Sequence, residues 1–361
     1  MGERHYLRPT GFVDAPFGLD GRVARLAGGL LWFSAVEVAT VRDGRIASLD
    51  LFPVADAEAA AGRLGEAASD AWRNLTAPRA PLALGERVVR LDQPQVMGIV
   101  NVTPDSFSDG GRFGAADEAA EAGHAMSAAG AAIVDVGGES TRPGAKPIWE
   151  GDEIERVLPV VQRLAGAGTA VSVDTRKAAV MEAALGAGAA MVNDVSALTW
   201  DERSAGAVAK AGCPVVLMHH QGTPETMQAA PRYDQPVLFA VYDWLEARIA
   251  AAEAAGISRE RIVIDPGIGF GKTVQHNLQL LNGLALLHGL GCPLMLGASR
   301  KRMIGALSGE APAEARLPGS LALALKGADQ GAQLLRVHDV PETVQALRVW
   351  RGLRDAALAP S

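Results

Sequence analysis

The sequence predicts an α/β protein built around a (β/α)₈ TIM barrel, with a small N-terminal α+β extension. From Val96 onward one unit recurs: a short β-branched apolar run, a polar or glycine-rich turn, and a stretch rich in Ala, Leu and Glu. Strands this apolar, alternating with helices, indicate a parallel sheet covered by helices on both faces. Eight such units over residues 96–361 match this barrel in number and length. We therefore expect the extension at 1–92 and the barrel at 93–361.

The extension is expected to form strand, turn, strand and helix in that order. Its strands are expected at 30–41 and 46–52, joined by a turn at 42–45. An Ala-rich helix is expected over 56–74, followed by a proline-bearing linker at 76–81. No chemical motif occurs in this part, so we expect a role in packing or dimerisation.

The expected barrel strands all end in hydrogen-bonding residues. They are expected at 96–101, 132–136, 170–174, 190–194, 214–219, 261–266, 293–298 and 333–337, with a last helix at 342–354. In this architecture the active site is formed by the carboxyl ends of the strands and the loops after them. A rim of acids, amides, histidines and cations is better explained by one shared pocket than by separate structural roles.

The composition excludes several classes of function. The 34 Lys and Arg against 41 Asp and Glu give a net charge of −7, which disfavours general binding to nucleic acid or membrane surfaces. The two cysteines, Cys213 and Cys292, lack metal-site spacing and are expected to be buried free thiols in a reducing compartment. No secretory signal is recognisable, and no run reaches the ~18 apolar residues of a membrane helix. We therefore expect a soluble, cytoplasmic protein.

Two long glycine-containing loops are expected to follow the first two barrel strands. The loop at 101–113 has the length of a mobile lid, and Asn101 at its start offers a neutral oxygen that suits Mg²⁺. The loop at 137–145 contributes the hydroxyl of Thr141 and the guanidinium of Arg142. Both loops emerge on the same rim, so we expect them to close over one ligand.

Carboxylates and an amide end three of the central strands. Asp174, Asn193 and Asp265 together suit a flat heterocycle that is rich in N–H donors and carbonyl acceptors. A guanidine-like edge is a natural partner for one ionised carboxylate. The alternative is that each acid forms a structural salt bridge.

Cations follow the last two strands. The segment 299–303, Ser-Arg-Lys-Arg-Met, opens a helix and is typical of an anion site. Arg336 can stack on a ring, and His338 can meet a phosphate. The glycine-rich segment 265–272 lacks the spacing of a nucleotide-binding P-loop, which disfavours that function.

Eight motifs stand in a fixed order along the chain, one for each barrel unit. They are MGIVNVTPDSFSDGG, DVGGESTRPGA, SVDT, NDVS, LMH, DPGIGFGK, SRK and RVHD. In this order they closely resemble those of the dihydropteroate synthases, a family of folate-pathway transferases. The resemblance covers residue 95 to the C-terminus and does not include the extension. It implies condensation of 6-hydroxymethyl-7,8-dihydropterin diphosphate with 4-aminobenzoate, giving 7,8-dihydropteroate and pyrophosphate.

The resemblance also implies roles for individual residues. The pterin is expected to contact Asp174, Asn193, Asp265 and Lys301, with Met218 as an apolar wall. The diphosphate is expected to contact Arg336, which also stacks on the pterin, His338, and a Mg²⁺ ion held by Asn101. The aminobenzoate pocket, which is the sulfonamide site of the family, is expected to be shaped by Phe107, Pro143, Phe270 and Ser299. Thr141 and Arg142 are expected to contact the substrate from the second loop, and Gly297 is also expected to bind substrate.

The family chemistry implied here is a Mg²⁺-assisted, SN1-like loss of pyrophosphate followed by attack of the aryl amine. Among these residues Asp174, Asp265, Lys301, Arg336 and His338 are expected to be catalytic. Family analogy also implies a homodimer.

Two alternatives share parts of this pattern. A pterin-dependent methyltransferase barrel would share the pterin pocket, and a non-catalytic paralogue would be expected to lack the diphosphate residues. The long first loop and the SRK and RVHD motifs favour the synthase. His220, Ala298 and Arg302 depart from the family pattern.

Overall fold

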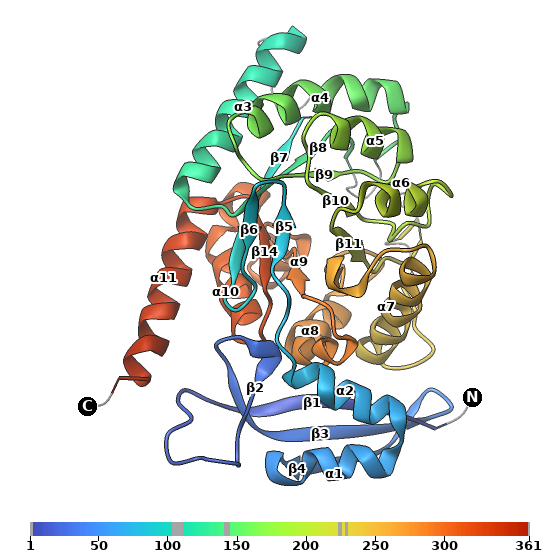
Figure 1. The fold of residues 1–361 in the computed structure, drawn as a ribbon, viewed down its shortest axis with the longest axis vertical. Helices are drawn as coiled ribbons and strands as arrows, with labels where there is room; N and C mark the ends of the chain where they lie inside the picture. Colours follow the sequence, from blue (N-terminus) through green and yellow to red (C-terminus); the bar gives the residue numbers. More distant parts are fainter. Residues whose placement is uncertain (1–2, 103–110, 141–144, 223–225, 228–229, 360–361) are drawn as a thin grey trace.

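The computed structural model describes residues 3–102, 111–140, 145–222, 226–227 and 230–359. It consists of an eight-stranded barrel with a four-stranded sheet and two helices docked against its side (Figure 1). Among the helices so described, none is long and apolar enough to cross a lipid bilayer.

The N-terminal sheet is antiparallel and is centred on β3. Strand β1 pairs with one edge of β3, while β2 and β4 pair with the other. Two helices contact the strands and share a core with them through Val38, Trp72 and Leu75. The elements are β1 (Arg4–Val13), β2 (Ala24–Arg25), η1 (Leu26–Gly28), β3 (Trp32–Arg42), β4 (Arg45–Pro53), α1 (Val54–Leu64) and α2 (Glu66–Thr76).

The expected strand–turn–strand is present, but the single expected helix is two. Asp43 and Gly44 both have positive φ, +48° and +74°, as the tight turn between β3 and β4 requires. The helix over 56–74 is interrupted at Gly65, where a φ of +110° ends one helix and begins the next. Strand β1 was not predicted.

A short hairpin closes the amino-terminal end of the barrel. It consists of β5 (Leu82–Leu84) and β6 (Arg87–Val89). Its apolar side chains pack with interior residues from the starts of the barrel strands, among them Met97, Ile133 and Met191. The barrel is therefore plugged at this end, and its opposite end remains for a ligand.

All eight predicted barrel strands are present and parallel. They run in the order β12-β11-β10-β9-β8-β7-β14-β13, and a bridge between Ile264 and Leu294 joins the two ends of the sheet. Both faces are buried, which explains the continuous apolar runs. The strands are β7 (Gln95–Asn101), β8 (Ile133–Gly137), β9 (Val171–Asp174), β10 (Met191–Asp194), β11 (Val215–Met218), β12 (Ile262–Asp265), β13 (Met295–Leu296) and β14 (Leu334–Val337).

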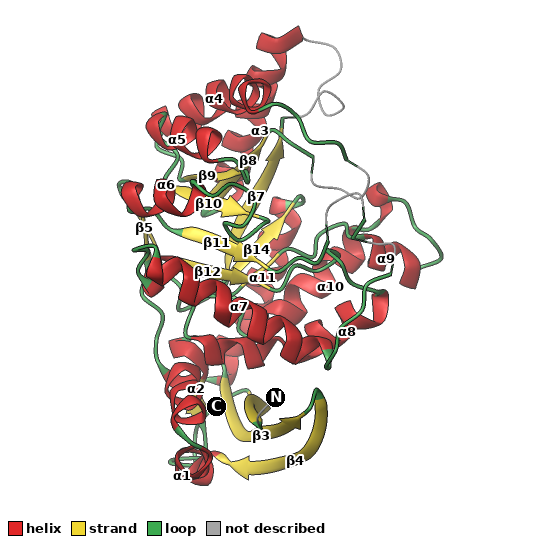
Figure 2. Cartoon of the chain, turned by 90° about the vertical axis from the view of Figure 1, so that its right-hand side faces the viewer, coloured by secondary structure: helices red, strands yellow, loops and turns green. Residues whose placement is uncertain are grey.

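Helices surround the barrel, with α7 and α8 on the side that faces the N-terminal sheet (Figure 2). The α-helices are α3 (Gly111–Ala129), α4 (Glu150–Gly166), α5 (Ala178–Gly186), α6 (Ser204–Ala211), α7 (Val237–Ala254), α8 (Val274–Gly283), α9 (Arg302–Leu307), α10 (Leu317–Ala328) and α11 (Val340–Ala357). The short helices are η2 (Arg259–Arg261), η3 (Leu284–Leu290) and η4 (Ala313–Ala315). The expected helix at 342–354 lies within α11.

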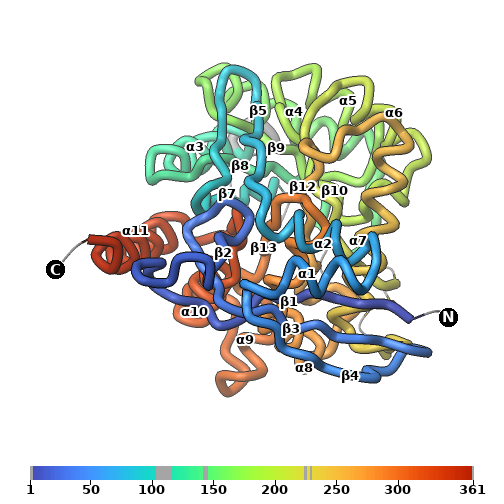
Figure 3. The backbone as a smooth tube through the Cα atoms, turned by 60° about the horizontal axis from the view of Figure 1, so that its bottom comes forward, coloured from blue at the N-terminus to red at the C-terminus, as the bar shows by residue number. Residues whose placement is uncertain are grey.

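The linker after α2 is fixed to the barrel by the half-buried guanidinium of Arg79. Arg79 donates to the backbone oxygens of Asn74, Ala77, His288 and Cys292, at 2.9 to 3.3 Å. Cys292 and Cys213 are buried free thiols, as predicted. Figure 3 shows how the N-terminal strands and helices lie across the side of the barrel that carries α7 and α8.

His288 predicts a pH-dependent loss of stability. Burial, with Arg79 nearby, lowers the pKa of His288 to about 3. Its contribution is therefore complete above the unfolded pKa of about 6.5 and is lost as the pH falls from there towards 3. Between pH 7.5 and pH 5 this one residue is expected to remove about 2 kcal/mol from the free energy of unfolding.

The check is the difference between the wild type and His288→Gln in urea melts at several pH values. Asp174 and Asp194, whose pKa values burial raises, titrate in the opposite sense. Their contribution is the same in both proteins and cancels in the difference. Parallel profiles for the two proteins would contradict the assignment.

Candidate active site

One cavity opens at the carboxyl ends of the barrel strands. It spans about 340 Å³ of space that no atom fills, part of which is open to solvent. Its lining is Asp174, Asn193, Val195, Met218, Asp265, Gly267, Ile268, Phe270, Met295, Gly297, Lys301 and Arg336. The structure thus brings together eight of the residues that the sequence nominated: Asp174, Asn193, Met218, Asp265, Phe270, Gly297, Lys301 and Arg336.

Asp265, which ends β12, is fixed by the glycine-rich turn that follows it. Its Oδ1 accepts a hydrogen bond of 2.6 Å from the N–H of Gly267. Gly267 has φ +65°, and a Cβ there would lie 1.9 Å from the oxygen of His219, so only glycine fits. Burial raises the pKa of Asp265, while the Gly267 N–H and the Lys301 ammonium oppose that rise. The second oxygen of the carboxylate lies beside Gly297.

Lys272 fixes the same turn from behind and was missed by the sequence analysis. Its buried Nζ donates to the oxygens of Gly267 and Phe270, both at 3.0 Å, and lies 2.7 Å from Nδ1 of His219. Burial lowers the pKa of Lys272 well below its usual range, although Asp265 opposes this. Its partners are mainly backbone oxygens, which leave no trace in the sequence, and the glycine-rich motif was its only signal.

Arg336 of β14 spans the buried carboxylate of Asp135 and the largely buried carboxylate of Asp174. Its Nε donates to Asp135 at 2.7 Å and its terminal nitrogen donates to Asp174 at 2.6 Å. Asp135 also accepts from the Asn193 amide at 2.9 Å, and its other oxygen has no partner among the described residues. Burial raises the pKa of Asp174 to about 7, Arg336 opposes the rise, and Asp135 adds to it.

Asp135 was also missed. Its signal was an acid in the middle of an apolar strand, at A-I-V-D-V, which a buried strand accepts only when the charge is compensated. The ion pair means that the positive charge of Arg336 is already neutralised locally. Asp174 therefore forms a salt bridge, as the alternative interpretation expected, and it also lines the cavity.

His338 and Ser299 form a pair beside this cavity. The backbone N–H of His338 donates to Ser299 Oγ at 3.2 Å, and the same oxygen lies 3.1 Å from His338 Nδ1. Burial, with Arg336 and Arg300 nearby, lowers the pKa of His338 to about 4. The imidazole is therefore neutral at pH 7, not the cation counted in the sequence analysis. With the serine hydroxyl donating to Nδ1, Nε2 carries the proton.

Lys301 and Phe270 define one side of the cavity. The Lys301 ammonium lies 4.3 Å from the centre of the Phe270 ring, which is a cation–π distance. Gly269 approaches the Lys301 side chain closely, since a Cβ there would lie 3.4 Å from Cδ. The adjacent Arg302 is exposed and does not line the cavity.

Asn101 lies at the end of β7, next to β8. Its Oδ1 is 3.8 Å from the point a Cβ on Gly137 would occupy, and Asp174 contacts the same point from the other side. Within the described part of the chain, no group of three His, Cys, Asp or Glu residues could hold a metal ion. A cation at Asn101 would therefore take most of its ligands from water and substrate.

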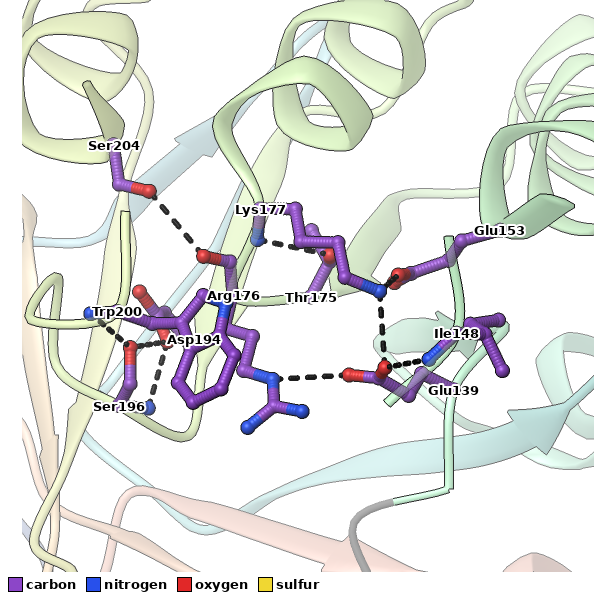
Figure 4. A network of polar contacts seen from close by, with 10 residues as sticks. All are labelled: Glu139, Ile148, Glu153, Thr175, Arg176, Lys177, Asp194, Ser196, Trp200 and Ser204. Atoms are coloured by element: carbon purple, nitrogen blue, oxygen red, sulfur yellow. Dashed lines mark hydrogen bonds and ion pairs between the residues drawn. The ribbon is translucent and has the colours of Figure 1, made fainter. Parts of the chain in front are cut away.

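A buried ionic cluster closes the base of the second loop (Figure 4). Glu139 accepts from the backbone N–H of Ile148 at 2.9 Å, from Lys177 at 2.9 Å and from Arg176 at 3.0 Å. Burial would raise the pKa of Glu139, but these donors hold it below its usual range. Lys177 also pairs with Glu153 at 2.5 Å. The cluster joins Glu139 to Ile148, at the two ends of the segment 139–148, and to Arg176 and Lys177. No role for it was predicted.

Four predicted substrate-binding residues lie outside the described residues: Phe107, Thr141, Arg142 and Pro143. Of the departures from the family pattern, Ala298 is buried, and His220 lies against Trp244 with its Nδ1 3.2 Å from the oxygen of Gly222.

Comparisons with known proteins identify the family of this chain. A model of the family described as "Pterin binding enzyme" matches residues 97–338. The dihydropteroate synthase of Escherichia coli K12 is 49% identical over 260 residues, which are 72% of this chain and 91% of that protein.

Two solved structures of Xanthomonas albilineans dihydropteroate synthase superpose on the chain. The one with 4-aminobenzoic acid has a TM-score of 0.72 and 48% identity, and the match covers 78% of this chain and 99% of that one. The one with 7,8-dihydropteroate has a TM-score of 0.70 and 45% identity, covering 78% and 100%. These relatives are synthases rather than methyltransferases. The chain belongs to the pterin-binding enzyme family and, within it, to the dihydropteroate synthases.

Proposed function

We propose that this transferase condenses 6-hydroxymethyl-7,8-dihydropterin diphosphate with 4-aminobenzoate to give 7,8-dihydropteroate and pyrophosphate. The observation that carries the proposal is the cavity at the carboxyl ends of the strands, in which carboxylates, an amide, an ammonium and a guanidinium converge. It lies in a chain 49% identical to a dihydropteroate synthase.

The cavity suits a flat heterocycle with a guanidine-like edge. Asp265 has one oxygen tied to Gly267, which leaves the other to accept from ring N–H groups. The Asn193 amide nitrogen is occupied by Asp135, so its oxygen is oriented as an acceptor. Met218 supplies an apolar surface in the same wall. We therefore assign this part of the cavity to the pterin.

The described lining of the cavity contains no serine, threonine or cysteine that could serve as a nucleophile. A displacement without a protein nucleophile fits this set of residues. The C–O bond to the diphosphate breaks, the resulting pterin-methyl cation is attacked by the aryl amine, a C–N bond forms and the amine loses a proton. The protein must stabilise the leaving diphosphate and exclude water from the cation.

The diphosphate is assigned to the side of the cavity formed by β14 and its neighbours. Here Arg336 is held in a fixed orientation by two carboxylates, and neutral His338 can donate from Nε2. Asn101 is the residue that would hold Mg²⁺, and a neutral oxygen beside a phosphate site suits this ion. When bound, Mg²⁺ would supply positive charge against the departing pyrophosphate.

Asn101→Ala is expected to raise the Mg²⁺ concentration for half-maximal activity about tenfold, because the ion loses its one protein oxygen. The measurement is pyrophosphate release over a Mg²⁺ titration, at saturating concentrations of both organic substrates. An unchanged Mg²⁺ dependence would remove Asn101 from the metal site.

A homodimer is a further part of the proposal, by analogy with the family. The outer face of α11 is apolar at two positions one turn apart, since Val349 is 61% exposed and Leu353 is 70% exposed. A face of this kind on a surface helix favours association with another protein surface. Sedimentation of the purified chain is the measurement.

The deciding experiment is an assay of pyrophosphate release from the pterin diphosphate, with and without 4-aminobenzoate. Release that depends on the arylamine, together with formation of 7,8-dihydropteroate, is the expected result. Transfer of a methyl group from a methylated pterin, or no turnover at all, would favour one of the two alternatives raised above.

A further inference from the structure

The N-terminal sheet has no role in the proposed chemistry, yet it makes specific contacts with the barrel. On β1, the buried Tyr6 stacks on Phe239 of α7 with ring centres 4.3 Å apart. Its hydroxyl donates to both carboxylate oxygens of Asp243 at 2.8 Å. Arg4 of the same strand pairs with Asp243 at 3.0 Å and Glu246 at 2.6 Å. The sheet is thereby docked along α7.

Asp243 is shared with the loop that precedes α7. Gln235, in the segment between β11 and α7, donates from Nε2 to Asp243 Oδ2 at 2.7 Å. The β3–β4 turn touches the neighbouring residue, since a Cβ on Gly44 would lie 2.6 Å from the oxygen of Asp234. The N-terminal sheet therefore contacts the end of this loop directly at Asp234, and indirectly through Asp243 of α7, to which both Tyr6 and Gln235 donate.

The same loop continues to the wall of the cavity. Tyr233 donates from its hydroxyl to the oxygen of Gly271 at 2.8 Å. A Cβ on Gly271 would lie 2.5 Å from the oxygen of Gln221, so the two loops are in backbone contact there. Gly271 directly follows Phe270, whose ring lines the cavity and lies under the Lys301 ammonium.

We propose that the N-terminal sheet acts as a brace for the active site. Its β3–β4 turn and Tyr6 set the position of residues 233–235, and Tyr233 in turn sets the position of Phe270. The family resemblance places Phe270 in the aminobenzoate pocket, so the brace tunes binding of the arylamine rather than of the pterin. This part of the inference rests on the proposed function. The residues involved are positioning residues, because none of them lines the cavity except Phe270.

The structure offers a matched pair of glycines for the test. Gly44 and Gly18 have nearly equal φ, +74° and +70°, so alanine strains both backbones alike. A Cβ at Gly44 meets the oxygen of Asp234, whereas a Cβ at Gly18 meets nothing within 4 Å. Gly44→Ala is therefore the test variant and Gly18→Ala the control. Tyr6→Phe, which keeps the stacked ring and loses the two bonds to Asp243, is the second test variant.

Gly44→Ala and Tyr6→Phe are each expected to raise KM for 4-aminobenzoate about three- to tenfold, the equivalent of one lost hydrogen bond. The kcat and the KM for the pterin diphosphate should remain within about twofold of wild type, and Gly18→Ala should match wild type. Tyr233→Phe combined with Gly44→Ala should give less than the product of the single effects, because both act on one path. Equal arylamine KM values for Gly44→Ala and Gly18→Ala would overturn the brace.

A second readout does not depend on the reaction. Amide hydrogen exchange in a peptide spanning 230–240 is expected to be faster in Gly44→Ala than in Gly18→Ala and wild type. Unchanged exchange would overturn the brace whether or not the chain makes 7,8-dihydropteroate. If the wild type lacks synthase activity while exchange is still faster in Gly44→Ala than in wild type, the proposed function is rejected and the contact between sheet and loop is retained.

Discussion

Asp265→Asn is expected to lower kcat/KM for the pterin diphosphate by about 10³-fold or more, with little loss of folded protein. The carboxylate oxygen that faces the cavity is replaced by an amide that can present N–H groups to a substrate edge made of N–H donors. A buried donor without an acceptor is costly, and the negative charge that would pair with a guanidine-like edge is lost. The Gly267 N–H keeps an acceptor in either case, so the turn should survive.

Asp194→Asn is the matched control. Asp194 ends the neighbouring strand β10 and is also buried, and it accepts from Ser196 and from the N–H of Leu198 without lining the cavity. This variant is expected to lose stability and to retain most of its kcat. Steady-state kinetics and urea melts on both proteins separate the two effects. If Asp265→Asn and Asp194→Asn lost kcat/KM in the same proportion to their loss of stability, Asp265 would have no specific role in the pterin site.

Lys301→Ala should act in the same direction as Asp265→Asn. Its ammonium lies over Phe270 and opposes the rise in the pKa of Asp265. Its removal therefore makes the carboxyl harder to ionise, in addition to removing a cation from the cavity wall.

The barrel was predictable because its pattern is local. Each strand is buried on both faces, so each appears as a short apolar run, and each run ends at the rim where polar residues collect. This is why Asp174, Asn193, Asp265 and Arg336 could be nominated together before any distance was known. Because all eight strands run in the same direction, their carboxyl ends lie on one edge of the barrel, and these residues lie there with them.

The missed features are non-local. Strand β1 contains Pro9 and Gly11 and depends on pairing with β3, which begins about twenty residues after β1 ends. Asp135 and Arg336 are 201 residues apart, so their ion pair has no local signature. Lys272 binds backbone oxygens, which every residue carries. In each case the partner is either distant in the sequence or a backbone atom, so a short segment of sequence does not reveal it.

Arg336→Met is expected to cost about 3–5 kcal/mol of stability as well as all measurable activity, because it breaks a buried ion pair from one side. It leaves the buried Asp135 and the largely buried Asp174 without the cation that compensates them. Asp135 is fully buried and already has one oxygen without a partner among the described residues, so its position depends on Arg336 and Asn193. Arg336→Met is thus expected to lower both stability and activity, whereas Asp265→Asn is expected to lower activity with little loss of folded protein.

The penalty should depend on pH in a defined direction. Asp174 has a pKa raised to about 7 by burial even though Arg336 opposes the rise, so removing Arg336 raises it further. A carboxyl with a raised folded pKa contributes stability that is present below its unfolded pKa and is lost as the pH rises through the folded value. Arg336→Met should therefore be most unstable relative to wild type near pH 8 and should partly recover near pH 6, when Asp174 takes up a proton.

A compensating variant tests whether Arg336 stabilises the protein by neutralising the two carboxylates. In Asp135→Asn combined with Arg336→Met, one buried charge is removed from each side, so much of the lost stability should return while activity stays absent. Thermal melts of the two single variants and the double variant at pH 6 and pH 8 give the coupling between the residues. Additive losses, or a penalty that is the same at both pH values, would mean that Arg336 supports the barrel by packing alone. Recovery of folding without recovery of turnover would mean that the guanidinium compensates the two carboxylates and is required again, separately, for the diphosphate.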